Sequence, residues 1–150
     1  MEKLLLDKKG YMDENQEIIS LKFEKVMQAR SYTVIVLAAD EKKFAIYTEP
    51  GCGKSLQIYL TGTTKARPYT HDLMQMIFRG FDIRIKQVVI NDLQDTIYFA
   101  RLFLEQQIGD VLHIVEIDAR PSDCINLALL SHAPLYCTKK VLERVVPIEE

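Results

Sequence analysis

The chain has 150 residues, of which 48% are hydrophobic and 27% charged, proportions typical of a globular domain in water. Its 19 basic and 21 acidic residues give a formal net charge of −2, which excludes the strongly basic character of many nucleic-acid-binding domains but not a local basic groove. At roughly 100–200 residues per domain, this length predicts one domain over residues 18–150, preceded by a charged appendage over residues 1–17.

The first half of the chain is dominated by patterns typical of β-strands. Apolar and polar residues alternate from Ile18, with Ile19, Leu21 and Phe23 on one side, as in a half-buried strand. Further strands are predicted over residues 32–39, 44–48 and 56–60, with turns at residues 40–43 and 50–53.

Helices enter the pattern in the second half of the chain. A helix is predicted over residues 71–79, with Thr70 as its N-cap and Gly80 as its end. A second helix begins at Pro121, which suits a first helical turn, and a third follows the cap Thr138 over residues 139–144. Strands are predicted over residues 81–90, 96–104, 111–117 and 133–137. Strands in hairpin groups, interrupted by helices, predict an α+β fold with a mixed, largely antiparallel sheet and about three helices.

The cysteines and the apolar runs bear on the protein's environment. Cys52, Cys124 and Cys137 are odd in number and show no Cys-x-x-Cys spacing, which disfavours a disulfide framework or a zinc cage. We therefore expect a reducing, cytoplasmic location. The longest uncharged apolar run, residues 32–39, is far shorter than the ~18–20 residues of a membrane span, and the N-terminus shows no signal-peptide core. We expect no membrane association.

One segment imitates a phosphate-binding loop. Residues 50–55 read Pro-Gly-Cys-Gly-Lys-Ser, like the end of the pattern GxxxxGK[ST]. That motif needs a glycine-rich loop followed by a helix whose amides face the phosphates. Here Thr48 stands at the first glycine position and a strand is predicted after Ser55, so we interpret the segment as a hairpin turn.

Two other segments combine charged residues with helix starts, one from Arg67 to Leu73 and one from Asp118 to Asp123. A purely structural explanation exists for each residue. Thr70 and Ser122 would cap helices, acidic residues in a first turn would complement the helix dipole, and Arg120 would pair with Asp118.

The functional alternative is that the two helix starts face each other. Three carboxylates would then hold Mg²⁺ or Mn²⁺. His71 would act as a general base or as a further metal ligand, and Arg67 or Arg120 would brace a phosphate. This set suits metal-assisted hydrolysis of phosphodiester bonds. The candidate catalytic residues are His71, Asp72, Asp118, Arg120 and Asp123, the candidate metal ligands are Asp72, Asp118 and Asp123, and the candidate substrate-binding residues are Arg67, Thr70 and Ser122.

Four motifs in order resemble the bifunctional nuclease family. They are Pro-Tyr-Thr-His-Asp-Leu from Pro68, Tyr-Phe-Ala-Arg-Leu from Tyr98, Asp-Ala-Arg-Pro-Ser-Asp from Asp118, and Ala-Pro-Leu-Tyr from Ala133 with the Val141-Leu142 helix after it. The resemblance extends from about residue 19 to residue 144, and the Asp-Ala-Arg-Pro-Ser-Asp stretch is distinctive.

The resemblance implies an α+β domain that self-associates, with homodimers expected, and that acts on DNA and RNA. It also implies a helix bearing an acidic residue before the Pro68 motif, for which residues 61–66 leave too little room. We therefore expect this helix to be absent. Two functions are favoured at this point, a metal-dependent nuclease and a non-catalytic regulatory or protein-interaction module that keeps the family fold, and some other hydrolase is the remaining alternative.

Overall fold

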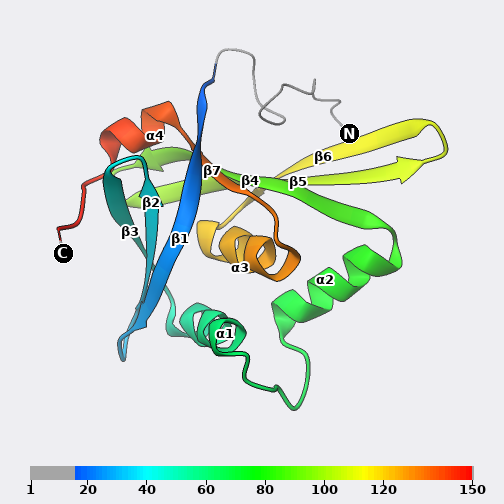
Figure 1. Ribbon diagram of the computed structural model, residues 1–150, viewed down its shortest axis with the longest axis horizontal. Coiled ribbons are helices and arrows are strands. Elements are labelled where there is room, and N and C mark those ends of the chain that lie inside the picture. The colour runs from blue at the N-terminus through cyan, green and yellow to red at the C-terminus, as the bar shows by residue number, and fades with distance from the viewer. Residues whose placement is uncertain (1–15, 150) are drawn as a thin grey trace.

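The computed structural model describes residues 16–149 and shows one seven-stranded sheet with helices packed against it (Figure 1). The strands are β1 (Ile18–Gln28), β2 (Thr33–Ala39), β3 (Lys42–Thr48), β4 (Ile83–Gln94), β5 (Ile97–Ile108), β6 (Val111–Ala119) and β7 (Leu135–Thr138). The helices are α1 (Pro50–Thr61), α2 (Thr70–Gly80), α3 (Pro121–Ser131) and α4 (Lys139–Arg144). The α+β prediction is confirmed, and the predicted appendage lies outside the described residues except for Gln16 and Glu17.

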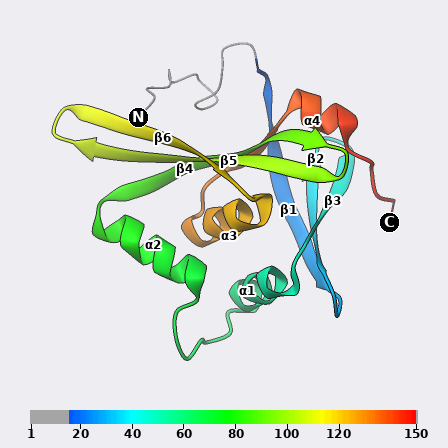
Figure 2. The same cartoon turned by 180° about the vertical axis from the view of Figure 1, so that it is seen from behind.

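The sheet has the strand order β3-β2-β1-β7-β4-β5-β6. All neighbouring strands are antiparallel except β4 and β7, which are parallel. The short strand β7 therefore joins two antiparallel groups, β3-β2-β1 and β4-β5-β6, into one sheet. Seen from either side, α1, α2 and α3 lie on the same face of this sheet (Figure 2).

The core lies between that face and the helices. Strand alternation turns Val88 and Ile90 of β4 toward the helices, where they join the same buried cluster as Ile125 and Leu127 of α3. Fully burying side chains of this size contributes roughly 1.5–3 kcal/mol each. Because α3 is buried along most of its length, its first turn is held at a defined place beside the sheet.

The segment predicted as a turn and a strand, residues 50–60, is helix α1 instead. Pro50 occupies the first helical turn, where its fixed φ and missing N–H do no harm. Leu56 is fully buried, whereas Leu60 is exposed, so the alternation of Leu56, Ile58 and Leu60 that imitated a strand is not a burial pattern. The predicted turn and strand are therefore wrong, and so is the expectation that no helix precedes the Pro68 motif, because α1 lies between β3 and α2.

Residues 50–55 do not form a phosphate-binding loop, but the reason differs from the one that the sequence indicated. A helix does follow Pro50, but Gly53, Lys54 and Ser55 lie inside α1 rather than in a loop before it. Gly53 is buried against β2, where a Cβ atom would lie 2.3 Å from Thr33 Oγ1. This glycine therefore permits a close approach of helix to strand and does not cradle a ligand.

The remaining helices match the predictions closely. The helix that begins at Pro121 ends at Ser131, and Thr138 caps α4 by accepting a hydrogen bond from the Val141 amide at 3.2 Å. At α2 the N-cap residue is Tyr69 rather than Thr70, since the Asp72 carboxylate accepts a hydrogen bond from the Tyr69 amide at 2.8 Å. No helix among the described residues combines the length and the apolar character needed to cross a membrane.

Candidate functional site

A cavity of about 600 Å³ opens where the first turns of α1, α2 and α3 meet. Its lining comes from three separate stretches of the chain, residues 49–55, 68–71 and 120–123. The two polar segments singled out from the sequence therefore do face each other, and α1 provides a third wall. The positive ends of three helix dipoles border one cavity, an arrangement that favours negatively charged ligands.

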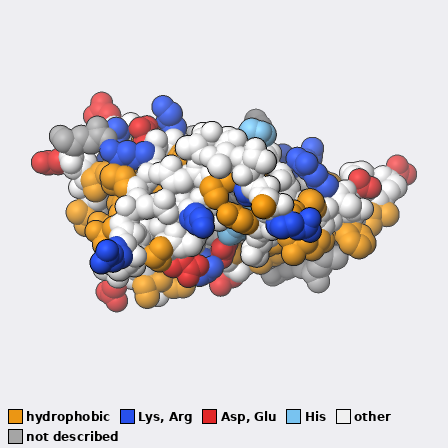
Figure 3. All heavy atoms as spheres, turned by 90° about the horizontal axis from the view of Figure 1, so that it is seen from below, with side chains coloured by type: hydrophobic (Ala, Val, Ile, Leu, Met, Phe, Trp, Pro, Cys, Tyr) orange, Lys and Arg blue, Asp and Glu red, His pale blue; other side chains and the backbone are white. Residues whose placement is uncertain are grey.

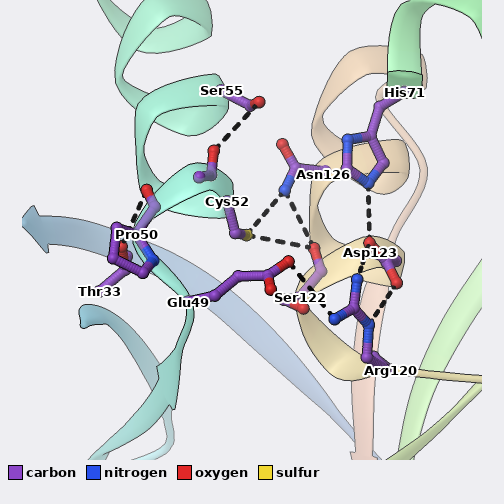
Figure 4. Close-up of polar contacts among 11 residues, drawn as sticks. Thr33, Glu49, Pro50, Cys52, Ser55, His71, Arg120, Ser122, Asp123 and Asn126 are labelled. Carbon is purple, nitrogen blue, oxygen red and sulfur yellow. Dashed lines mark hydrogen bonds and ion pairs between the residues drawn. The ribbon is translucent and has the colours of Figure 1, made fainter. Parts of the chain in front are cut away.

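A network of polar and charged side chains crosses this cavity from α2 to α1 (Figure 4). His71 Nε2 lies 3.0 Å from Asp123 Oδ1. Arg120 donates two hydrogen bonds to the same carboxylate, from Nε to Oδ2 at 2.8 Å and from Nη2 to Oδ1 at 3.2 Å. Arg120 Nη1 also reaches Glu49 Oε1, at 3.4 Å. Asp123 is thus the centre of the network and connects a histidine with an arginine.

The partners of Asp123 decide its charge. Burial by itself would raise the pKa of Asp123, but the hydrogen bonds from Arg120 and His71 outweigh it and hold the pKa below its ordinary value. The same contacts with Asp123 raise the pKa of Arg120. At neutral pH the site therefore contains a carboxylate anion and a guanidinium cation.

His71 is placed to transfer protons. Its side chain is only 14% exposed, and Asp123 accepts a hydrogen bond from Nε2 when the proton resides there. This tautomer leaves Nδ1 as the proton acceptor. A carboxylate that orients a histidine in this way is a common element of general acid–base sites.

Four of the predicted residues border the cavity, namely Thr70, His71, Arg120 and Asp123. Ser122 is not part of the cavity wall. This residue is buried, and its backbone carbonyl accepts hydrogen bonds from Asn126 Nδ2 at 3.1 Å and from the Cys52 thiol at 3.9 Å. Arg67 is exposed in the loop before α2 and is not part of the cavity wall.

Asp72 is occupied elsewhere. Besides the Tyr69 amide, its carboxylate contacts Lys65 Nζ at 2.5 Å. Burial by itself would raise the pKa of Asp72, but these two contacts together outweigh burial and hold the pKa below its ordinary value. Asp72 therefore caps α2 and binds the preceding loop, outside the cavity lining.

Asp118 lies on the other face of the sheet. In β6, Val115 and Ala119 pack into the main core, so strand alternation turns Ile114, Glu116 and Asp118 the opposite way. Asp118 stands opposite Arg101 of β5 in the strand register. Within residues 16–149 it makes no hydrogen bond or ion pair with Arg120, contrary to the structural pairing that the sequence suggested.

The three carboxylates predicted as metal ligands, Asp72, Asp118 and Asp123, therefore do not come together. Across residues 16–149, no three His, Cys, Asp or Glu side chains lie close enough to one another to hold a metal ion. The two carboxylates that do approach each other, Glu49 and Asp123, both bind Arg120, whose positive charge opposes a cation between them. The donor set does not fit a protein-held metal.

The contribution of α1 to the site was not predicted from the sequence. Asn126 Nδ2 donates to Cys52 Sγ at 3.1 Å, and this contact fixes α1 against α3 so that Glu49 approaches Arg120. The signal was present in the sequence, because a proline directly after Glu49 is typical of a helix start. The apolar alternation that follows it favoured a strand instead.

The fold and the site define a class of protein, an α+β domain whose helix starts gather a histidine, a carboxylate and an arginine at one cavity. The chain belongs to the bifunctional nuclease domain family, whose family model matches residues 34–148. An uncharacterized protein of Mycobacterium tuberculosis is 28% identical over 120 residues, covering 79% of this chain and 69% of that protein. "Bifunctional nuclease 1" of Arabidopsis thaliana is 29% identical over 84 residues, covering 56% of this chain and 26% of the plant protein.

The network makes a prediction about stability in acid. Because the pKa of Asp123 is lowered in the folded protein, its carboxylate stabilises the fold above about pH 4, and this contribution is lost as the pH falls further. Asp123→Asn removes it. The difference in melting temperature between wild type and variant should therefore shrink between pH 6 and pH 3. Asp118→Asn is the control variant. If the difference in melting temperature between wild type and Asp123→Asn stays constant with pH, the role given to Asp123 is contradicted.

Proposed function

We propose that this protein hydrolyses phosphodiester bonds of DNA, RNA or both. The observation that carries the proposal is the His71–Asp123 contact of 3.0 Å at the wall of an open cavity. Membership of the bifunctional nuclease domain family supports it, as does the name of the plant relative. Lys and Arg side chains are scattered over the helix-bearing face rather than gathered in one patch (Figure 3), so phosphate recognition is expected to be local.

The positions of these groups support the following chemistry. His71 Nδ1 accepts a proton from water as its oxygen forms a bond to phosphorus, and the leaving oxygen departs with the electron pair of the broken bond. Asp123 holds the imidazole and stabilises it once protonated. The Arg120 guanidinium, whose side chain is 62% exposed, neutralises charge on the phosphoryl oxygens.

The requirement for Mg²⁺ or Mn²⁺ stays a prediction. A divalent ion would supply charge neutralisation on the phosphate, but the side chains described above do not form a site for it. A chelator measures the requirement. Loss of cleavage in EDTA, restored by added Mg²⁺ or Mn²⁺, would support it, and undiminished cleavage in EDTA would contradict it.

The test of the proposed function is cleavage of labelled single-stranded DNA and RNA by the purified chain, beside two matched variants. Asp123→Asn should lose activity, because it removes the group that orients His71. Asp118→Asn should retain activity, because Asp118 lies on the other face of the sheet. Equal activity in all three proteins would point to a contaminating nuclease, whereas binding without cleavage by the wild type would support the alternative of a non-catalytic interaction module.

Self-association and a cytoplasmic location belong to the same proposal. The described sheet ends in two edge strands, β3 and β6, and α2 leaves Leu73, Met76 and Ile77 about half exposed. These surfaces support contact with a second copy, for which light scattering should give twice the chain mass of 17.3 kDa.

All three cysteines are free, as expected in a reducing compartment.

A further inference from the structure

The segment that imitated a phosphate loop has a position that the proposed chemistry does not use. Gly51, Lys54 and Ser55 line the same cavity as His71 and Arg120, from the wall that α1 provides. Figure 4 shows Ser55 on α1 and His71 at the start of α2, on two different helices that flank the opening. A ligand that reaches His71 therefore also faces this wall.

Among residues 16–149, the polar and charged side chains of the network that lines the cavity are paired, and one further lining charge is not. His71, Arg120 and Glu49 all take part in the network around Asp123. Lys54 also lines the cavity and is exposed, yet within the described part of the chain it makes no hydrogen bond or ion pair. The Lys54 ammonium group is thus a positive charge in the cavity wall that has no partner among the described residues.

The surroundings of Lys54 suit an anion. The first turn of α1 contains no acidic residue, and the Glu49 side chain does not cap the helix because it extends toward Arg120. A Cβ atom at Gly51 would meet nothing within 4 Å, so the space beside Gly51, three residues before Lys54 in α1, is open. The Ser55 hydroxyl, which contacts the Gly51 carbonyl at 3.4 Å, adds a neutral hydrogen-bonding group.

We propose that Lys54, assisted by Ser55, binds the phosphate next to the scissile one in a single strand of nucleic acid. This inference rests on the proposed function, which places the scissile phosphate at His71 and Arg120. A cavity of about 600 Å³ is within the roughly 300–1,000 Å³ of ligand sites and exceeds what a single phosphate group needs. The protein therefore selects chains that carry a flanking phosphate over isolated phosphodiesters.

The test measures binding of fluorescein-labelled hexathymidylate by anisotropy, in a His71→Asn background that prevents cleavage. Lys54→Gln should weaken binding about fivefold at 0.1 M salt and reduce the salt slope by about 0.7, the values for one phosphate contact on a single strand. Lys54→Arg should restore most of the affinity. Lys22→Gln, which removes an exposed lysine of β1, is the matched control and should change nothing.

Cleavage of two substrates completes the experiment. Lys54→Gln should lower kcat/KM for the oligonucleotide by a similar factor and leave hydrolysis of bis(p-nitrophenyl) phosphate, which has no flanking phosphate, unchanged. Unaltered oligonucleotide binding by Lys54→Gln, or an equal loss for Lys22→Gln, would overturn the subsite whether or not the protein cleaves. Absence of cleavage by the wild type, with Lys54-dependent binding intact, would overturn only the proposed hydrolysis.

Discussion

Replacing His71 with asparagine is expected to lower the rate of phosphodiester cleavage by about 10²–10⁴-fold, the usual contribution of a general acid–base group. Asparagine keeps a hydrogen-bond donor that can face Asp123, but it has no basic nitrogen that can accept a proton. The fold should be preserved, because the His71 side chain contributes one polar contact rather than core packing. Initial rates on a labelled oligonucleotide measure the effect, and thermal unfolding verifies that the variant is folded.

His113→Asn is the matched control for this loss. His113 lies in β6, pairs with Gln106 in the strand register and is outside the cavity lining, so its replacement should leave the rate unchanged. Full activity of a folded His71→Asn variant would remove His71 from the mechanism. The cavity would then be interpreted as a binding site without proton transfer.

The sequence predicted the parts of the fold in which local and long-range preferences agree. The helix from Pro121 to Ser131 has a proline in its first turn and a buried apolar face, and the Thr138 cap uses a side chain only three residues from its partner. The strands expected over residues 81–90, 96–104 and 111–117 are β4, β5 and β6, each extended at its C-terminal end. Periodicity and capping are sufficient for such elements.

The wrong predictions concern segments whose local sequence pattern was ambiguous or whose structure depends on tertiary packing. Leu56, Ile58 and Leu60 alternate as in a strand, but burial of Leu56 and the packing of Gly53 on Thr33 select a helix. Asp118 is two residues from Arg120 in the sequence, yet strand alternation in β6 turns it to the other face of the sheet. Proximity along the chain therefore predicted the wrong set of carboxylates, whereas His71 and Asp123, which are 52 positions apart, do meet.

Gly53→Ala is expected to destabilise the protein, against the normal preference of helices for alanine. In a helix interior, alanine is more favourable than glycine by about 1 kcal/mol of free energy. Here, however, its Cβ would lie 2.3 Å from Thr33 Oγ1 and 2.6 Å from Thr33 Cγ2. Thr33 is fully buried and, being β-branched, is stiff at χ1, so α1 must move away from β2. Overpacking of this kind costs about 1–3 kcal/mol, or several degrees in melting temperature.

Two further variants separate this clash from a general effect of alanine in α1. Gly51→Ala, where a Cβ meets nothing within 4 Å, should leave the melting temperature unchanged or raise it. Thr33→Ala removes Oγ1 and Cγ2, so the double variant Gly53→Ala/Thr33→Ala should be more stable than the two single losses predict. Additive losses would show that the approach of α1 to β2 is not what requires glycine. Since Glu49 is the N-cap residue of α1 and binds Arg120, a displaced helix should also weaken the proposed cleavage in Gly53→Ala.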